Sequence, residues 1–261
     1  MSLNRIKILG VPFNNVTQKE ALDLVLEAVK ENKKFFVVTP NPEICLAAAK
    51  DAEFLSALES AQLSIPDGFG ILWAARYLHG KKTIWRFLGT LVSPWLSKKY
   101  SPLKERVTGT DLMQVFCREH PRKKIFLLGA SKEVNEKLSR KLIDSGVNIV
   151  GNFSGDASNK LSSIICSMIN SSEAEVLFVA FGAPKQEKWI RENFRHLRTV
   201  KVAIGVGGAF DFLAGSRRRA PDWMRKTGLE WLYRLIIEPK RIKRICNAVV
   251  VFPWKVFRSA T

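Results

Sequence analysis

The chain alternates between two hydrophobic patterns over most of its length. Short runs rich in Val, Ile, Leu and Phe are typical of buried strands. These runs occupy 6–13, 35–39, 63–65, 124–128, 147–153, 175–181 and 200–204. Stretches with one apolar face at helical spacing lie between them, at 17–32, 43–50, 52–61, 69–78, 110–119, 131–144, 159–170 and 184–193. Strands that alternate with helices in this way predict an α/β fold, with a largely parallel sheet flanked by helices.

Two segments depart from this alternation. From about residue 215 the strand pattern stops, so we predict an α/β core over 1–214 and a basic helical appendage over 215–261. Residues 81–103 have an apolar centre with Trp85 and Trp95 near its ends and Lys pairs on both sides. As a helix this centre would be roughly 21 Å long, too short for a bilayer of about 30 Å. We expect an amphipathic insertion in a membrane interface; an oligomer interface, or a helix that covers the core, is the alternative.

Basic residues give the chain a formal charge of +18, most of it in two segments. Residues 81–106 hold seven Lys or Arg and one acid, and residues 217–258 hold twelve and three, which gives +6 and +9. Such charge beside Trp and Phe indicates a polyanionic partner, either a phospholipid surface or a nucleic acid, and solubility alone is the plainer alternative. No helix-turn-helix or RNA-binding signature occurs. We therefore favour an anionic membrane surface and expect no nucleic acid.

Several absences limit the compartment and the chemistry. The four cysteines are far apart, which indicates reduced thiols. Neither a signal peptide nor an apolar run of about 18 residues is seen, so we expect a cytoplasmic protein. The chain has no P-loop, no G-x-S-x-G motif, no zinc-ligand spacing and no D-x-D metal clamp. We therefore expect no cofactor and no bound metal.

Polar residues follow several predicted strands, at the edge where a parallel sheet gathers its ligands. Asp67 directly follows the run 63–65, within Pro66-Asp67-Gly68. A carboxylate in that position is partly desolvated, which raises its pKa and suits it to accept a proton from a sugar hydroxyl. Its alternative role is to cap the helix that follows.

Glycine-containing turns follow three of the later strands. Backbone N–H groups at a helix start can bind phosphate, so we expect nucleotide contacts at Gly129 and Gly182 and, in the last of these turns, at Gly207 and Gly208. Small residues in such turns commonly serve only steric needs, which is the alternative. The last turn, 205–208, lacks the G-x-G-x-x-G spacing, so a Rossmann dinucleotide site is not supported.

Seven motifs follow one another in order across nearly the whole chain. They are TPNPE (39–43), IPDGFG (65–70), RVTGTDLM (106–113), FLLGA (126–130), FGAPKQEKWI (181–190), GVGGAFDFLAG (205–215) and RRRAPDWMRKTGLEWLYRLIIEPKRIKR (217–244). This set resembles the WecG/TagA/CpsF glycosyltransferases. The resemblance implies inverting, metal-independent transfer of a sugar from a UDP-sugar donor to a sugar on undecaprenyl diphosphate, in cell-surface polysaccharide or teichoic acid synthesis. N-acetylmannosamine is the first choice of donor sugar, and glucose or N-acetylmannosaminuronic acid is the alternative.

The resemblance also implies roles for individual residues. Asp67 matches the family's proposed catalytic base, and Thr39, Asn41, Arg106 and Gln186 match polar residues of its substrate pocket. Arginines of the appendage are expected to hold the lipid diphosphate. The candidates are Arg217, Arg218, Arg219, Arg225, Arg234, Arg241 and Arg244. The enzyme would be peripheral, on the inner face of the cell membrane, with a homo-oligomer as a possible assembly. The connection between Gly80 and Arg106 is longer than the family's usual one, which leaves the acceptor geometry open.

Overall fold

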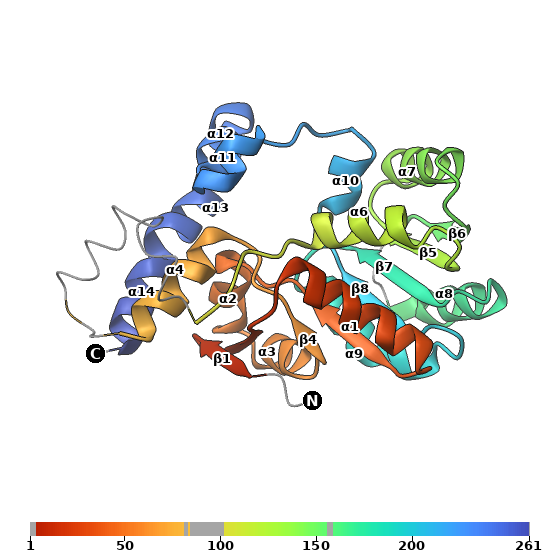
Figure 1. Ribbon diagram of the computed structural model, residues 1–261, viewed down its shortest axis with the longest axis horizontal. Coiled ribbons are helices and arrows are strands. Elements are labelled where there is room, and N and C mark those ends of the chain that lie inside the picture. The colour runs from red at the N-terminus through yellow and green to blue at the C-terminus, as the bar shows by residue number, and fades with distance from the viewer. Residues whose placement is uncertain (1–3, 81–82, 84–101, 156–158, 261) are drawn as a thin grey trace.

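The computed structural model describes residues 4–80, 83, 102–155 and 159–260 and contains the expected parallel sheet (Figure 1). Within the described residues the strands of this sheet are β3 (Phe35–Val38), β4 (Leu63–Ser64), β5 (Ile125–Gly129), β6 (Ile149–Phe153), β7 (Val176–Ala180) and β8 (Val202–Gly205). They are hydrogen-bonded in the order β4-β3-β8-β7-β5-β6, and each neighbouring pair is parallel. The turns after these strands therefore meet along one edge of the sheet.

The apolar run at 6–13, predicted as one strand, forms a separate hairpin instead. β1 (Arg5–Ile8) pairs antiparallel with β2 (Val11–Asn14), outside the main sheet. The chain reverses at Leu9 and Gly10, which both have positive φ angles. Two positive φ angles are what a tight hairpin turn requires, and a Leu at the first of them hides the turn from the sequence pattern.

Helices cover both faces of the sheet. In the core they are α1 (Gln18–Lys30), α2 (Pro42–Ala48), α3 (Ala52–Glu59), α4 (Phe69–Leu78), α6 (Gly109–Glu119), α7 (Lys132–Asp144), α8 (Asn159–Ser171), α9 (Lys185–Asn193), the 3-10 turn η2 (Phe194–His196) and α10 (Ala209–Leu213). Alternate strand residues point to opposite faces. In β7, Leu177 and Val179 join a core with α3, α4, α8 and α9, whereas Val176 and Phe178 join a core with α1, α6 and α7. A strand covered on both faces has to be apolar throughout, as β7 is.

The segment after residue 215 contains helices and, among its described residues, no strand, as predicted. It comprises α11 (Asp222–Thr227), α12 (Glu230–Ile237), the 3-10 turn η3 (Pro239–Arg241), α13 (Ile242–Cys246), the π-helix η4 (Asn247–Val251) and α14 (Phe252–Ala260). α14 runs alongside α4 (Figure 1), and its Phe252 and Val256 are fully buried in the core. Trp223 and Ile236, on α11 and α12, are 60% and 68% exposed. The inner face of α14 thus packs on the core, and the rest of the appendage presents apolar side chains outward.

The predicted insertion at 81–103 lies outside the described residues, apart from Thr83, Pro102 and Leu103. Leu103 is buried in the same core as α4, shortly before Arg106 in the chain. Across the ranges that the structure describes, no helix is both long enough and apolar enough to cross a bilayer.

Candidate active site

A cavity of about 290 Å³ lies between the edge of the sheet and the appendage. Its core side consists of the β3–α2 and β4–α4 turns, the start of α4 and the residues around the start of α6. Its other side consists of α12, α13, η4 and the start of α14. The predicted site residues Asn41, Asp67, Arg106, Arg219 and Arg234 all contribute to its wall. The fold therefore brings residues that are far apart in the sequence to one site.

Asp67 lies in the β4–α4 turn, which backbone hydrogen bonds hold against two neighbouring segments. The Asp67 N–H donates to the Pro40 carbonyl, and the Val107 N–H donates to the Pro66 carbonyl, both at 3.1 Å. The N-cap of α4 is Gly68, and no side-chain hydrogen bond caps this helix. The alternative role of Asp67 as the helix cap is therefore wrong. Among the described residues none donates a hydrogen bond to its carboxylate, so the group is available to a ligand in the cavity.

The acid strength of Asp67 follows from its surroundings. Burial raises the pKa of Asp67 to about 6, even though the positive charges of Arg106 and Arg234 act to lower it. The negative charge of Glu230 adds to the rise. A carboxylate with this pKa is largely ionised at neutral pH and is a stronger base than an ordinary aspartate, which suits it to proton abstraction.

Glu230 holds two arginines at the cavity. Arg106 Nη1 donates to Glu230 Oε2 at 2.8 Å, and Arg234 Nη2 donates to Oε1 at 2.5 Å. The Arg106 guanidinium also lies over the Phe69 ring, 5.3 Å from its centroid. Gly228, between α11 and α12, has a φ of +82° and lies directly against this ring. One carboxylate shared by two guanidinium groups leaves one positive charge in excess, on side chains already oriented for an anion.

Asp111 forms a matching cluster at the start of α6. Arg219 Nη1 donates to Asp111 Oδ1 at 2.6 Å, and Arg225 Nη1 lies 3.8 Å from the same oxygen. The Thr108 hydroxyl, which caps α6, donates to Asp111 Oδ2 at 2.7 Å. Burial alone would raise the pKa of Asp111, but the hydrogen bonds from Arg219 and Thr108 hold it below its ordinary value. This carboxylate therefore stays charged, and Asp222, which also pairs with Arg225, balances the second arginine.

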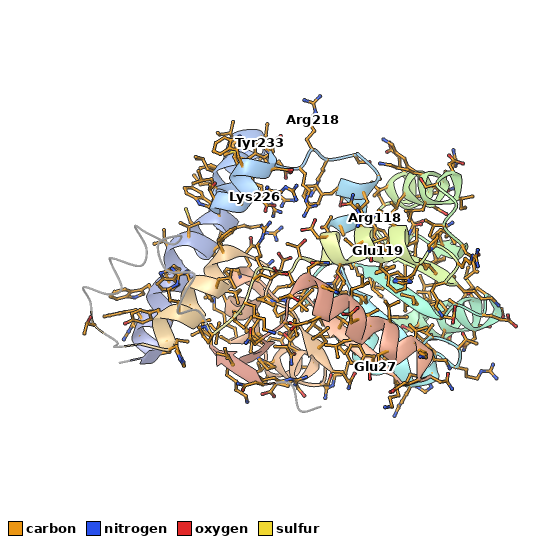
Figure 2. The ribbon with its side chains drawn as sticks, viewed as in Figure 1. Glu27, Arg118, Glu119, Arg218, Lys226 and Tyr233 are labelled. Atoms are coloured by element: carbon orange, nitrogen blue, oxygen red, sulfur yellow. The ribbon has the colours of Figure 1, made fainter. Side chains whose placement is uncertain are left out.

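The seven candidate arginines of the appendage differ in where they lie. Arg219 and Arg234 line the cavity, and Arg225 supports Arg219 from behind through Asp111. Arg218 points away from the molecule, as Figure 2 shows above the loop between α10 and α11. The other three pair with other acids: Arg217 with Asp211, Arg241 with Glu238, and Arg244 with Glu43, which itself lines the cavity. Position thus favours Arg219 and Arg234 as the diphosphate ligands, a role that stays a prediction.

Two predicted pocket residues follow β3, and they do different work. Asn41 lines the cavity, and its Oδ1 caps α2 by accepting from the Ile44 N–H at 3.0 Å. Thr39 is buried behind the cavity wall, where its hydroxyl donates to the Gly205 carbonyl at 3.0 Å. Thr39 therefore ties β3 to the end of β8, and it sets the turn from which Asn41 projects.

Gln186 is buried, is not among the residues that line the cavity, and joins two of the glycine turns. Its side chain is 1% exposed, and its Oε1 accepts from the N–H groups of Gly182 and Gly207, each at 3.1 Å. Its Nε2 donates to the carboxylate of Glu187 at 2.8 Å. Two of the N–H groups expected to bind phosphate, those of Gly182 and Gly207, thus donate to Gln186 in this structure. Their predicted nucleotide contact stays untested.

The other two predicted glycine contacts lie after β5 and at the start of α10. A Cβ on Gly129 would lie 2.8 Å from the carbonyl carbon of Ala180, so the steric alternative accounts for glycine there. Gly208 is the N-cap of α10. Nucleotide binding at these positions also stays a prediction.

Asp111 and Glu230, the two acids that organise the arginines, are not among the site residues predicted from the sequence. Each carries a local signal. Asp111 stands three residues after Thr108, as in a helix cap, and Glu230 precedes Arg234 by four residues, the spacing of a helical ion pair. Glu230 carries a second signal, because it is one of only three acids in residues 217–258, where twelve residues are Lys or Arg.

Comparisons with known proteins agree with the motifs. A family model described as "Glycosyl transferase WecG/TagA/CpsF family" matches residues 6–99 and 88–261. A protein of Bacillus subtilis (strain 168) is 31% identical over 245 residues, which are 92% of this chain and 86% of that protein. One of Staphylococcus aureus (strain MRSA252) is 29% identical over 98% of this chain and 93% of its own. One of Bacillus spizizenii (strain ATCC 23059 / NRRL B-14472 / W23) is 33% identical over 83% and 77%.

All three relatives carry the name N-acetylglucosaminyldiphosphoundecaprenol N-acetyl-beta-D-mannosaminyltransferase. The family model covers both the sheet that carries Asp67 and the appendage that closes the cavity. The resemblance of the seven motifs is thereby confirmed over nearly the whole length of the chain. On this agreement of motifs, fold and relatives, the chain belongs to the WecG/TagA/CpsF family of glycosyltransferases.

Proposed function

We propose that the protein transfers N-acetylmannosamine from its UDP-sugar to N-acetylglucosamine on undecaprenyl diphosphate, during synthesis of a cell-surface polymer. The names of the three relatives give this sugar and this acceptor for those proteins. The observation that carries the proposal is the carboxylate of Asp67, which faces a cavity whose wall also contains Arg106, Arg219 and Arg234. A base beside arginines suits a reaction that joins a sugar hydroxyl to a sugar diphosphate.

Asp67 acts as the general base. Its carboxylate accepts the proton of the acceptor hydroxyl while the hydroxyl oxygen bonds to the anomeric carbon of the donor sugar. The bond from that carbon to the diphosphate oxygen breaks on the opposite face, so the configuration inverts and UDP leaves. One proton passes to Asp67 and the bonding electron pair passes to UDP, without oxidation or reduction.

The protein's own cations stabilise the two diphosphates of the reaction. Arg106, a predicted residue of the substrate pocket, stabilises the leaving diphosphate of UDP, and Arg219 and Arg234 of the appendage hold the diphosphate of the acceptor. This mechanism requires no metal ion, so transfer is expected to continue in excess EDTA. Loss of activity on chelation, with recovery on adding Mg²⁺ or Mn²⁺, would contradict this part of the proposal.

The enzyme reaches its acceptor as a peripheral protein at the inner face of the membrane. Trp223 and Ile236 are exposed on the appendage, among its basic side chains, a combination that binds anionic lipid surfaces. Trp231 is 37% exposed and also lines the cavity, so the proposed lipid-facing surface adjoins the reaction site.

A donor panel tests the function. The full-length protein is mixed with a short-chain, water-soluble diphosphate-linked N-acetylglucosamine and one donor at a time: UDP-N-acetylmannosamine, UDP-N-acetylglucosamine, UDP-glucose or UDP-N-acetylmannosaminuronic acid. Mass spectrometry should show an added N-acetylhexosamine with the first donor alone. Transfer of glucose or of the uronic acid would replace the donor assignment, and no transfer with any donor would contradict the function itself.

A further inference from the structure

The lining of the cavity beside Asp67 falls into two groups of residues with different chemistry, which we call its charged end and its apolar end. One end carries Asp67 and the cavity-lining arginines of the two clusters. The other end is lined by Gly70, Trp73, Ile245, Ala248, Val249 and Pro253, none of which is ionisable. Glu43 also contributes to the wall, but Arg244 of α13 balances its charge at 2.7 Å. A ligand that fills the whole cavity therefore meets cations at one end and an apolar surface at the other.

Helix α4 connects the two ends. Phe69 stands at the charged end under Arg106, and Trp73 stands one turn further on the same face, about 6 Å along the axis. Trp73 is 4% exposed and stacks on Tyr77, with ring centroids 5.7 Å apart, so its position is fixed. Across the cavity, η4 packs against α2, and α14 packs against α4 and α2. η4 is a π-helical turn, a distortion that frequently occurs at functional sites.

Exposed apolar side chains lie next to this end along the chain. Val250, Val251 and Trp254 directly follow the cavity residues Val249 and Pro253 in the chain. Their side chains are 63%, 37% and 50% exposed. An apolar chain that enters the cavity here can leave it along a surface that is itself apolar.

We propose that the apolar end is a subsite for the first isoprene units of the acceptor, next to its diphosphate. This inference rests on the proposed function for the identity of the acceptor. A polyprenyl-diphosphate sugar is charged in the middle and apolar on one side, which matches the two ends of the cavity. A volume of about 290 Å³ is too small for a whole undecaprenyl chain. The rest of the chain therefore leaves past Val250 and Trp254 toward the bilayer. UDP has no apolar part of this kind.

The test measures binding of two acceptors that differ only in their tail. N-acetylglucosamine diphosphate esterified with methanol or with farnesol is titrated into the full-length protein by calorimetry, below the micelle concentration and without vesicles. Wild-type protein should bind the farnesyl ester at least about tenfold more tightly, because isoprene units leave water. Ala248→Phe fills the subsite, so it should weaken binding of the farnesyl ester about tenfold and leave binding of the methyl ester unchanged.

Matched changes outside the cavity serve as controls. Ile164→Phe places the same ring at an exposed position on α8, which contributes no residue to the cavity, and should bind both esters like wild type. If Ala248→Phe lowers the melting temperature, the nearly isosteric Val249→Thr replaces it, with Ile164→Thr as its control. The hydroxyl of Val249→Thr should cost about threefold in farnesyl affinity alone, since a polar group then faces the chain.

Two results would overturn the subsite. Wild-type protein would bind both esters equally, or Ala248→Phe would weaken UDP or the methyl ester as much as the farnesyl ester. Binding is measured apart from transfer, so the two proposals can fail separately. Tail-dependent binding without any sugar transfer would contradict the proposed function and still support the subsite. Sugar transfer without tail-dependent binding would support the proposed function and contradict the subsite.

Discussion

Asp67 lies in the turn after β4 and Glu187 lies in the first turn of α9, and burial raises the pKa of each, to about 6 and about 7 respectively. Their surroundings differ. Asp67 is partly exposed in the wall of the cavity, and no described residue hydrogen-bonds its carboxylate. Glu187 is fully buried away from the cavity, and it accepts a hydrogen bond from Gln186. A raised pKa therefore marks burial in both cases, and access to the cavity separates the proposed base from an internal support.

Replacement of Asp67 should have the largest effect on transfer. Asp67→Asn keeps the shape but cannot accept the proton, so transfer should fall by about 10²-fold or more. UDP binding, measured by calorimetry, should persist. The variant should melt at or above the wild-type temperature at pH 7.5, because it removes a charge that burial disfavours. Near-normal turnover of Asp67→Asn would remove it from the role of base.

The pH dependence of transfer should distinguish Asp67 from an ordinary carboxylate. Asp67 has to be ionised to accept a proton, and its pKa is about 6. kcat/KM should therefore be nearly level above pH 7 and fall about tenfold per unit below pH 6. Rates measured from pH 4.5 to 8.5, with stability checked by fluorescence at each pH, test this. A profile that bends near pH 4 would indicate an ordinary carboxylate and contradict the effect of burial.

Access to the cavity should also rank the arginines of the appendage. Arg219 lines the cavity and Arg218 points away from it, although they are neighbours in one Arg-Arg-Arg run. Arg219→Ala removes charged hydrogen bonds at the site and should lower kcat/KM for a soluble acceptor by about tenfold or more. Arg218→Ala should leave that value within about twofold of wild type. Equal losses in the two variants would mean that the loop has a different arrangement when substrate binds.

The smallest expected effect comes from Glu187→Gln. Glutamine can still accept from Gln186, so transfer should change by less than about threefold. The pKa of Glu187, about 7, lies above the ordinary value of 4.5, so ionisation of this group opposes folding. Its stabilising contribution is complete below pH 4.5 and is lost as the pH rises through 7. Glu187→Gln should therefore match wild type in melting temperature near pH 5 and exceed it at pH 8.5.

A large loss of transfer in Glu187→Gln at an unchanged melting temperature would contradict its assignment as a support. Glu187 would then have a direct part in the reaction, and the contrast with Asp67 would no longer hold.

The sequence predicts local features of this molecule well. The apolar periodicity places α4 at its observed bounds, and the position of Asp67 after an apolar strand indicates a desolvated carboxylate. Both depend on neighbours in the chain. The hairpin at β1 and β2 is missed because Leu9, at the first of its two turn positions, carries no turn signal, and a lone glycine such as Gly10 also fits a bulge within one strand.

Long-range partners are beyond the reach of such patterns. Arg106 meets Glu230 across 124 residues, and Arg219 meets Asp111 across 108. The run of three arginines looks uniform in sequence, and only the path of the chain between α10 and α11 decides which of them enters the cavity. The same holds for Gln186, whose side chain turns inward to two glycine turns.

Gly228 illustrates how a residue without reactive groups can limit which substitutions a protein tolerates during evolution. Its left-handed backbone disfavours other residues, and a Cβ there would lie 3.0 Å from the Phe69 ring on which Arg106 rests. A single substitution at 228 therefore disturbs an arginine of the site that it never touches. A descendant gene that gains a side chain at 228 has to reduce residue 69 as well, so we expect these two positions to change together when such enzymes diverge.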